Sequence, residues 1–164
     1  MRTIITKNKD IIYTPRWVVE KIIPIIPDGV ETIWECAAGN GSISKVLSEY
    51  GYNVISTDIV DGQDFLNYEP SKQYDFILTN PPWSLKTEFL ARLYELGKPF
   101  LVLLPAFSLE SMKRYNLFVK HGICMFMMWD RIKFLGTKRK CPFHVYWFGW
   151  NLKNFPNNTI QYLD

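Results

Sequence analysis

An apolar run that two prolines bring to an end constrains the fold of this chain more than any other feature. Residues 74–78 (Tyr-Asp-Phe-Ile-Leu) are few and rich in bulky side chains, which is typical of a buried strand. Pro81 and Pro82 cannot donate ladder hydrogen bonds, so the strand must end at Asn80. Together with Trp83 they form a stiff corner that presents an amide, a carbonyl and an indole. Ligands bind at the carboxyl ends of strands in open α/β sheets, so we expect a site here, the alternative being a strand-ending turn without function.

A glycine-rich turn follows an earlier strand. Residues 32–36 are strand-like, residues 37–41 read Ala-Ala-Gly-Asn-Gly, and a helical pattern comes next. Small residues let a ligand approach the backbone, and the start of the helix offers free N–H groups. Ser44 stands where a dinucleotide fingerprint has its third glycine, and the absence of Gly-Lys-Ser/Thr excludes a P-loop. The arrangement predicts the opening of a nucleotide-binding α/β unit.

The next strand, residues 53–58, ends in an acidic residue, and a second one lies in the turn after it. Asp58 lies 19 positions after Gly39, about where such folds place an acid on ribose hydroxyls. Asp64 offers an acceptor for an adenine amino group, and Phe65 beside it offers an apolar face. The alternatives are a solvated turn for Asp58 and a core position for Phe65.

The remaining pattern predicts one doubly wound α/β sheet. A short strand is expected ahead of residue 74, and the tail from Asn151 shows turn chemistry and no readable site. Further helices are expected over 13–23, 85–96 and 108–121, the first with Thr14 as a cap-like residue and Pro15 at the first helical position. Further strands are expected over 99–105, 123–129 and 144–150, the last two as a hairpin-like pair. We therefore predict a single domain over residues 1–164, with helices on both faces of the sheet and no separate target-recognition domain.

Composition limits the function classes. A formal charge of +3 permits a polyanionic partner but does not demand one. Cys36, Cys124 and Cys141 have neither the paired spacing of a disulfide framework nor that of a zinc site, so no metal is expected. The first residues lack the apolar core of a signal peptide, and no run reaches transmembrane length. We expect a soluble cytoplasmic protein with no membrane partner.

Taken together, these residues resemble the class I S-adenosylmethionine-dependent methyltransferases that modify amino groups, compact phage-like DNA adenine N6-methyltransferases in particular. The resemblance covers about residues 10–150 and carries a signature tetrapeptide, Asn80-Pro81-Pro82-Trp83. It implies a Rossmann-like, seven-stranded, mainly parallel sheet with an antiparallel last strand, and S-adenosylmethionine as the cofactor. By the same resemblance we expect the cofactor to contact Thr14, Pro15, Glu35, Cys36, Ala37, Gly39, Gly41, Asp58, Ile59, Asp64 and Phe65.

The tetrapeptide would be the catalytic segment. The Asn80 side-chain oxygen and the Pro81 carbonyl can accept the two N–H bonds of an exocyclic amine, stabilise the positive charge that grows on its nitrogen, and aim its lone pair. Trp83 offers a flat face for an unstacked base, and Phe143 is the candidate for the other side. Lys138, Arg139 and Lys140 would contact phosphates, or form a solvated turn.

We expect methyl transfer to adenine N6 in nucleic acid, with DNA favoured over RNA. A partner subunit or self-association could supply target recognition, because no separate domain is expected to do so. Alternatives are an amino-methyltransferase acting on protein glutamine, on rRNA or on tRNA, and a catalytically silent cofactor-binding subunit. Ser44 argues against a further alternative, a nicotinamide-dependent oxidoreductase, because the dinucleotide fingerprint has a glycine at that position.

Overall fold

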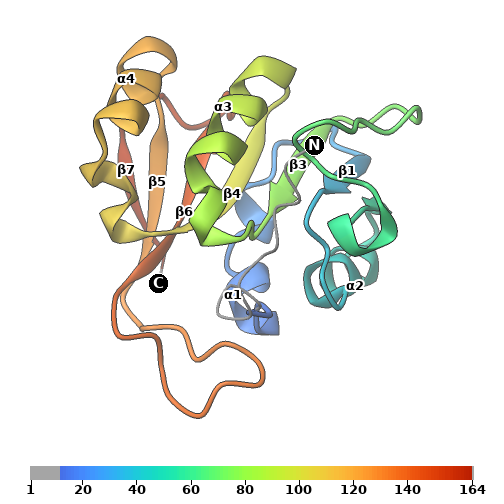
Figure 1. The fold of residues 1–164 in the computed structure, drawn as a ribbon, viewed down its shortest axis with the longest axis horizontal. Helices are drawn as coiled ribbons and strands as arrows, with labels where there is room; N and C mark the ends of the chain where they lie inside the picture. The colour runs from blue at the N-terminus through green and yellow to red at the C-terminus, as the bar shows by residue number, and fades with distance from the viewer. Residues whose placement is uncertain (1–11, 164) are drawn as a thin grey trace.

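Seven strands form one sheet in the order β2-β1-β3-β4-β6-β5-β7 in the computed structural model, which describes residues 12–163 (Figure 1). The strands are β1 (Thr32–Glu35), β2 (Asn53–Ser56), β3 (Phe76–Thr79), β4 (Phe100–Pro105), β5 (Cys124–Met128), β6 (Val145–Trp150) and β7 (Ile160–Leu163). β6 runs antiparallel to its neighbours β4 and β5, and the other pairs are parallel. The predicted α/β class with a seven-stranded, mainly parallel sheet is confirmed.

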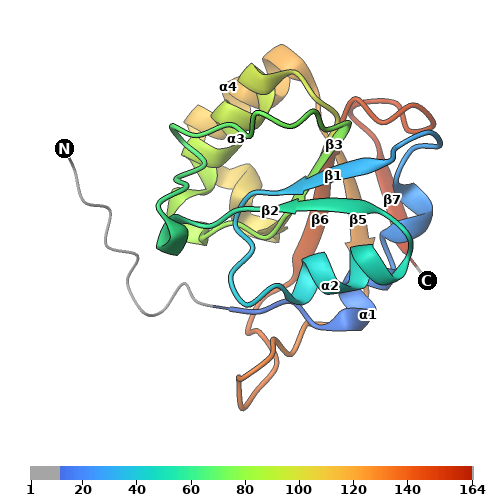
Figure 2. The ribbon, with the colours of Figure 1, turned by 90° about the vertical axis from the view of Figure 1, so that its right-hand side faces the viewer.

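Helices cover both faces of the sheet (Figure 2). α1 (Arg16–Glu20) and α2 (Ser42–Glu49) pack together on one face, and α3 (Lys86–Leu96) and α4 (Met112–His121) pack together on the other. Short 3-10 turns are η2 (Ile23–Ile25), η3 (Ile59–Asp61), η4 (Trp83–Leu85) and η5 (Ala106–Glu110). Each helix pair closes a separate apolar core against the sheet, and Trp83 packs at the edge of both cores.

Three elements differ from the sequence predictions. The helix expected over 13–23 is only the five-residue α1, and Pro15 rather than Thr14 precedes it as the N-cap. The short strand expected before residue 74 does not form, since residues 62–75 make turns and bends. The predicted antiparallel strand is β6, and β7 follows it in the tail, where no element was expected.

The chain order places a crevice between β1 and β3. From β1 the chain continues to β2 on one side, whereas β3 leads to β4 on the other side. β1 and β3 are parallel neighbours, so the loops that leave their carboxyl ends diverge. Such a switch point is where open α/β sheets bind ligands.

Candidate functional site

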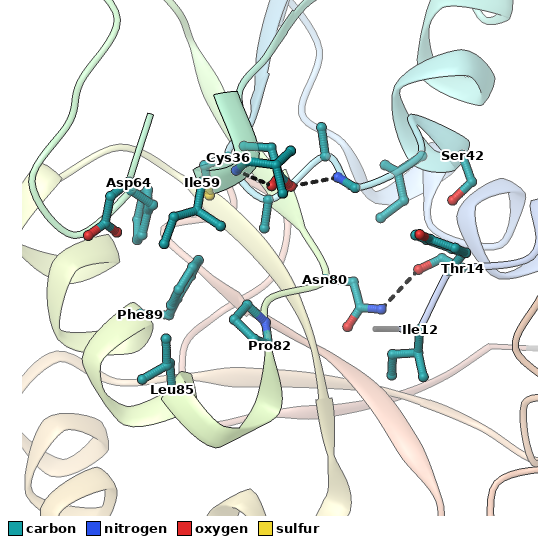
Figure 3. A pocket seen from close by; sticks show the side chains of 18 residues that line it. Ile12, Thr14, Cys36, Ser42, Ile59, Asp64, Asn80, Pro82, Leu85 and Phe89 are labelled. Atoms are coloured by element: carbon teal, nitrogen blue, oxygen red, sulfur yellow. Dashed lines mark hydrogen bonds between the residues drawn. The ribbon is translucent and has the colours of Figure 1, made fainter. Parts of the chain in front are cut away.

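A pocket of about 240 Å³ opens at the carboxyl ends of β1 and β3 (Figure 3). Its wall comes from residues 12–14, the β1–α2 turn, the segments after β2 and β3, and the first turns of α3. The lining residues are Ile12, Tyr13, Thr14, Cys36, Ala37, Ala38, Gly39, Ser42, Ile43, Asp58, Ile59, Val60, Asp64, Phe65, Asn80, Pro82, Leu85 and Phe89. Asp64 lies on one side of the pocket, and Thr14 and Asn80 lie on the other.

Most of the residues assigned to cofactor binding from the sequence meet at this pocket. Eight of them line it, namely Thr14, Cys36, Ala37, Gly39, Asp58, Ile59, Asp64 and Phe65, as do Asn80 and Pro82 of the tetrapeptide. Pro15, Glu35, Gly41 and Pro81 are not among the lining residues, and neither are Trp83, Phe143, Lys138, Arg139 and Lys140.

Asp58 holds the turn that forms the floor of the pocket. Its Oδ2 accepts the Gly39 N–H at 2.7 Å, and its Oδ1 accepts the Val60 N–H at 3.1 Å. A carboxylate has about four lone-pair sites, so two remain for a ligand. Asp58 therefore stabilises the turn and can also accept hydrogen bonds from the hydroxyl groups of a ligand.

Glu35 lies behind the pocket and is fully buried. Its Oε1 accepts the Thr79 hydroxyl at 2.5 Å and the Ala37 N–H at 3.2 Å. Its Oε2 has no hydrogen-bond partner among residues 12–163. Burial, only partly offset by these hydrogen bonds, raises the pKa of Glu35 to about 8.

Two contacts fix the side-chain amide of Asn80. Its Nδ2 donates to the Thr14 hydroxyl at 3.1 Å, and its Oδ1 accepts the Trp83 indole N–H at 3.1 Å (Figure 3 shows the first). The same indole N–H also lies 3.2 Å from the Leu103 carbonyl oxygen. Thr14, expected from the sequence to act like a helix cap, instead orients the amide at the pocket.

The aromatic residues expected to enclose a substrate are neighbours, but they touch each other. The Trp83 ring centroid lies 5.7 Å from that of Phe143 and 5.5 Å from that of Phe134. At this spacing a base does not fit between Trp83 and Phe143. Stacking on both sides of a base therefore requires Phe143 to move.

The basic residues lie on the segment 129–144, which projects from the carboxyl edge of the sheet (Figure 1). Lys138, Arg139 and Lys140 are exposed, and Lys140 lies 3.5 Å from Asp130. The same segment carries further exposed cations at 131 and 133 that the sequence analysis did not assign. Leu135 N–H donates to the Tyr13 carbonyl at 2.9 Å, so the segment is attached to one wall of the pocket.

Sequence reasoning missed several apolar residues of the pocket. Phe89 and Leu85 had no signal besides helical spacing, which predicts a core position as readily. Tyr13 precedes the Thr-Pro pair and gives no sign that its ring packs beside Gly39. In the part of the chain that the structure describes, no three His, Cys, Asp or Glu side chains gather to hold a metal ion. Within the same range, no helix combines the length and apolar character needed to cross a membrane.

No protein-family model matches the sequence, and no curated protein sequence matches it. Solved structures do resemble the fold, at sequence identities that show the fold alone. The type I restriction-modification system methyltransferase subunit from Streptococcus thermophilus superposes with a TM-score of 0.60 at 13% identity over 87% of this chain. This chain spans 45% of that subunit's length.

Other methyltransferases are similar at the same level. The precorrin-6y C5,15-methyltransferase from Geobacter metallireducens gives a TM-score of 0.52 at 14% identity, covering 92% of this chain and 91% of that one. A dimethyladenosine transferase from Plasmodium falciparum gives 0.53 at 12% identity, covering 85% of this chain and 62% of that one. The chain therefore has the Rossmann-like methyltransferase fold, which hosts unrelated substrates.

Proposed function

We propose that this chain is an S-adenosylmethionine-dependent methyltransferase that modifies the exocyclic amine of adenine in nucleic acid, with DNA favoured over RNA. The observation that carries the proposal is the Asn80 amide at the pocket, with Thr14 and Trp83 fixing its orientation. A carbonyl oxygen has two lone pairs, so one remains on Asn80 Oδ1 for a substrate N–H.

The residues that line the pocket are placed where the separate parts of S-adenosylmethionine would need them. Asp64, Phe65 and Phe89 would hold the adenine on one side, Asp58 the ribose hydroxyls, and the turn at Gly39 the amino-acid portion. The volume of about 240 Å³ is just below that of typical small-molecule sites, roughly 300–1,000 Å³. Tyr13 lines the pocket with its ring against the Gly39 turn, and we expect rotation of this ring to make room for the cofactor.

The chemistry follows from the acceptors at the corner. The cofactor, when bound, supplies an electrophilic methyl group. An adenine amine is a poor nucleophile because its lone pair is delocalised into the ring. Asn80 Oδ1 and the Pro81 carbonyl would accept its two N–H groups, direct its lone pair and stabilise the positive charge that develops on nitrogen. Neither group is a strong base, so proton loss would follow transfer.

The substrate assignment rests on the surface beside Asn80. Trp83 and Phe143 offer aromatic faces for a base outside its stack, once Phe143 has moved from Trp83. Lys138, Arg139 and Lys140 on the projecting segment would contact phosphates, with a binding strength that falls as salt rises. The likeness to a restriction-modification methyltransferase subunit supports DNA as the substrate.

The test is transfer of a tritiated methyl group from S-adenosylmethionine to duplex DNA, single-stranded DNA, tRNA and protein extract. We expect labelling of adenine in DNA, and a loss of about 10²–10³-fold in the rate of Asn80→Ala, because the amide acts on the charge of the transition state. Asn154→Ala, which changes an exposed asparagine of the tail, is the matched control and should retain activity. Near-normal turnover in Asn80→Ala would contradict the mechanism.

The other outcomes distinguish the alternatives. Labelling of tRNA or protein alone would replace the substrate while keeping the reaction class. Cofactor binding by calorimetry without transfer to any acceptor would favour a catalytically silent subunit. Absence of cofactor binding would overturn the proposal as a whole.

A further inference from the structure

The last strand leaves one side of its backbone open. β7 stands at the end of the strand order and pairs with β5, and no other strand of residues 12–163 pairs with it. The Met125 N–H donates to the Thr159 carbonyl, so residues 159, 161 and 163 direct their backbone groups toward β5. Because a strand alternates, the N–H and C=O groups of Ile160 and Tyr162 point outward. Such an edge is a template for another strand.

The face beside this edge is apolar and exposed. Ile160 and Tyr162 are 50% and 75% exposed and share a face with Met125 and Met127, their partners in register. α4 covers the same face and adds exposed Met112, Tyr115 and Val119. A groove of about 480 Å³ there is lined by Leu109, Tyr115, Phe118, Val119, Ile123 and Asn158. We call these exposed residues of α4 and β7, with the groove, the β7 face.

The β7 face is large enough for a stable interface. Its six exposed apolar residues, with Leu109 included, present on the order of 700 Å² if each large side chain contributes about 200 Å² in full. Monomers rarely expose apolar patches beyond roughly 300–600 Å², and a standard interface uses about 800 Å² per partner. Residues 160–163 also contain neither the charges nor the proline that commonly protect sheet edges.

We propose that the β7 face binds a second copy of this chain, with two β7 strands pairing antiparallel around a twofold axis. A twofold interface must be self-complementary, and an antiparallel pair of identical edges meets that condition. Side chains opposite each other must share a face, so the axis passes through a residue and not between two. We place it at Gln161, because this register sets the two residues with outward backbone groups, Ile160 and Tyr162, opposite each other across the junction. Ile160 then lies opposite Tyr162 of the second copy, as a hydrogen-bonded pair. The joined sheet has fourteen strands, and the two α4 helices flank the junction.

The proposed dimer predicts a molecular mass in solution and a disulfide cross-link between the two copies. The full chain of 19.3 kDa should sediment at twice that mass at micromolar concentration. Gln161→Cys should form a disulfide between copies on oxidation, because directly opposite residues of a non-hydrogen-bonded pair have Cα atoms about 4.5 Å apart. Gln73→Cys, an exposed glutamine outside the β7 face, is the matched control and should not.

Tyr162→Lys should raise the dimer dissociation constant at least about tenfold, because it places a charge on the strand edge. Tyr50→Lys, at an exposed tyrosine that follows α2, should leave it unchanged. Circular dichroism would show that both variants are folded. A monomeric wild-type chain would overturn the proposal, as would a dimer that survives Tyr162→Lys or gives no Gln161 cross-link. None of these outcomes depends on whether the chain transfers methyl groups.

Discussion

The Asn80 amide shows how one residue can acquire a defined orientation from its neighbours. An indole N–H donates and never accepts, so the group that Trp83 Nε1 meets must be the amide oxygen. The amide nitrogen then faces Thr14, whose hydroxyl accepts from it. Trp83 therefore positions Asn80, in addition to any contact of its ring with a substrate.

Trp83→Phe tests this positioning role, because it retains an aromatic ring and removes the donor. We expect kcat to fall by roughly 10–100-fold, since loss of orientation at a reacting group costs rate. S-adenosylmethionine affinity should change little, because Trp83 does not line the pocket. Steady-state kinetics and calorimetry on the same protein separate the two quantities.

The matched control is Trp150→Phe. Trp150 Nε1 donates to the His121 carbonyl at 2.8 Å, so this change removes an indole hydrogen bond outside the pocket. It should cost stability and leave kcat unchanged. Equal losses of kcat in the two variants would contradict a positioning role for Trp83.

At the scale of elements, the turn between β1 and α2 is shaped by a glycine that a ring covers. Gly39 has φ +53°, a backbone conformation that favours glycine, and a Cβ there would lie 3.1 Å from the Tyr13 ring. Gly51, after α2, has φ +94° but open space around it. The two glycines therefore share a positive φ, which would strain a residue with a Cβ, and they differ in crowding.

Gly39→Ala and Gly51→Ala should separate these two costs. Each should lower the free energy of unfolding by about 1–2 kcal/mol, because alanine resists a left-handed backbone. Gly39→Ala should lose more, because the added methyl group displaces Tyr13. Urea unfolding midpoints at constant slope measure the difference. An equal loss in both variants would show that the Tyr13 contact imposes no cost.

Elements with strong local signals could be predicted from the sequence. The strand at 74–78 is stopped by Pro81 and Pro82, and glycine and proline punctuate most other strands and helices. β7 has no such signal: it follows Asn151 and Asn158, both in left-handed conformations, and its strand state depends on pairing with β5 far away in the chain. The local sequence predicts turns in this tail, whereas pairing with the distant strand β5 makes residues 160–163 a strand.

In the candidate site, too, some residues could be placed from the sequence and others could not. Gly39, Asp58, Asp64 and Asn80 could be placed at one pocket because parallel strands bring their carboxyl ends to one edge. The packing of Tyr13 against Gly39 could not, because it depends on how residues 12–14 cross the sheet edge. Apolar residues from the helix at 86–96 were equally compatible with the core and with the pocket.

At the scale of the whole molecule, the switch point buries a carboxyl group between β1 and β3. Glu35 is fully buried, and its Oε2 has no hydrogen-bond partner among the described residues. Its pKa is raised from 4.5 to about 8, mainly because burial disfavours the charged form. Over much of that range the folded chain keeps a proton that the unfolded chain releases.

Stability should therefore fall as pH rises from about 5 to 8, by at most about 1.4 kcal/mol per pH unit, since the folded state binds more protons than the unfolded state. The carboxyl pKa values of Glu49 and Asp75 are lowered by hydrogen bonds, so their contributions change below this window. Burial raises the pKa of the Cys36 thiol well above its ordinary value, so its contribution to stability changes above this window.

Glu35→Gln should remove this slope, because an amide cannot ionise and still offers an oxygen to Thr79 and Ala37. The measurement is the free energy of unfolding in urea at pH 5, 6, 7 and 8 for wild type, Glu35→Gln and the exposed control Glu110→Gln. We expect wild type and the control to lose stability across the series and Glu35→Gln to stay nearly level. At pH 8 the variant should equal or exceed wild type, because wild type has by then lost nearly all the stability that the raised pKa of Glu35 costs across this window. Parallel pH profiles for wild type and Glu35→Gln would mean that Glu35 is ionised in the folded state, and water or a ligand would then have to reach Oε2.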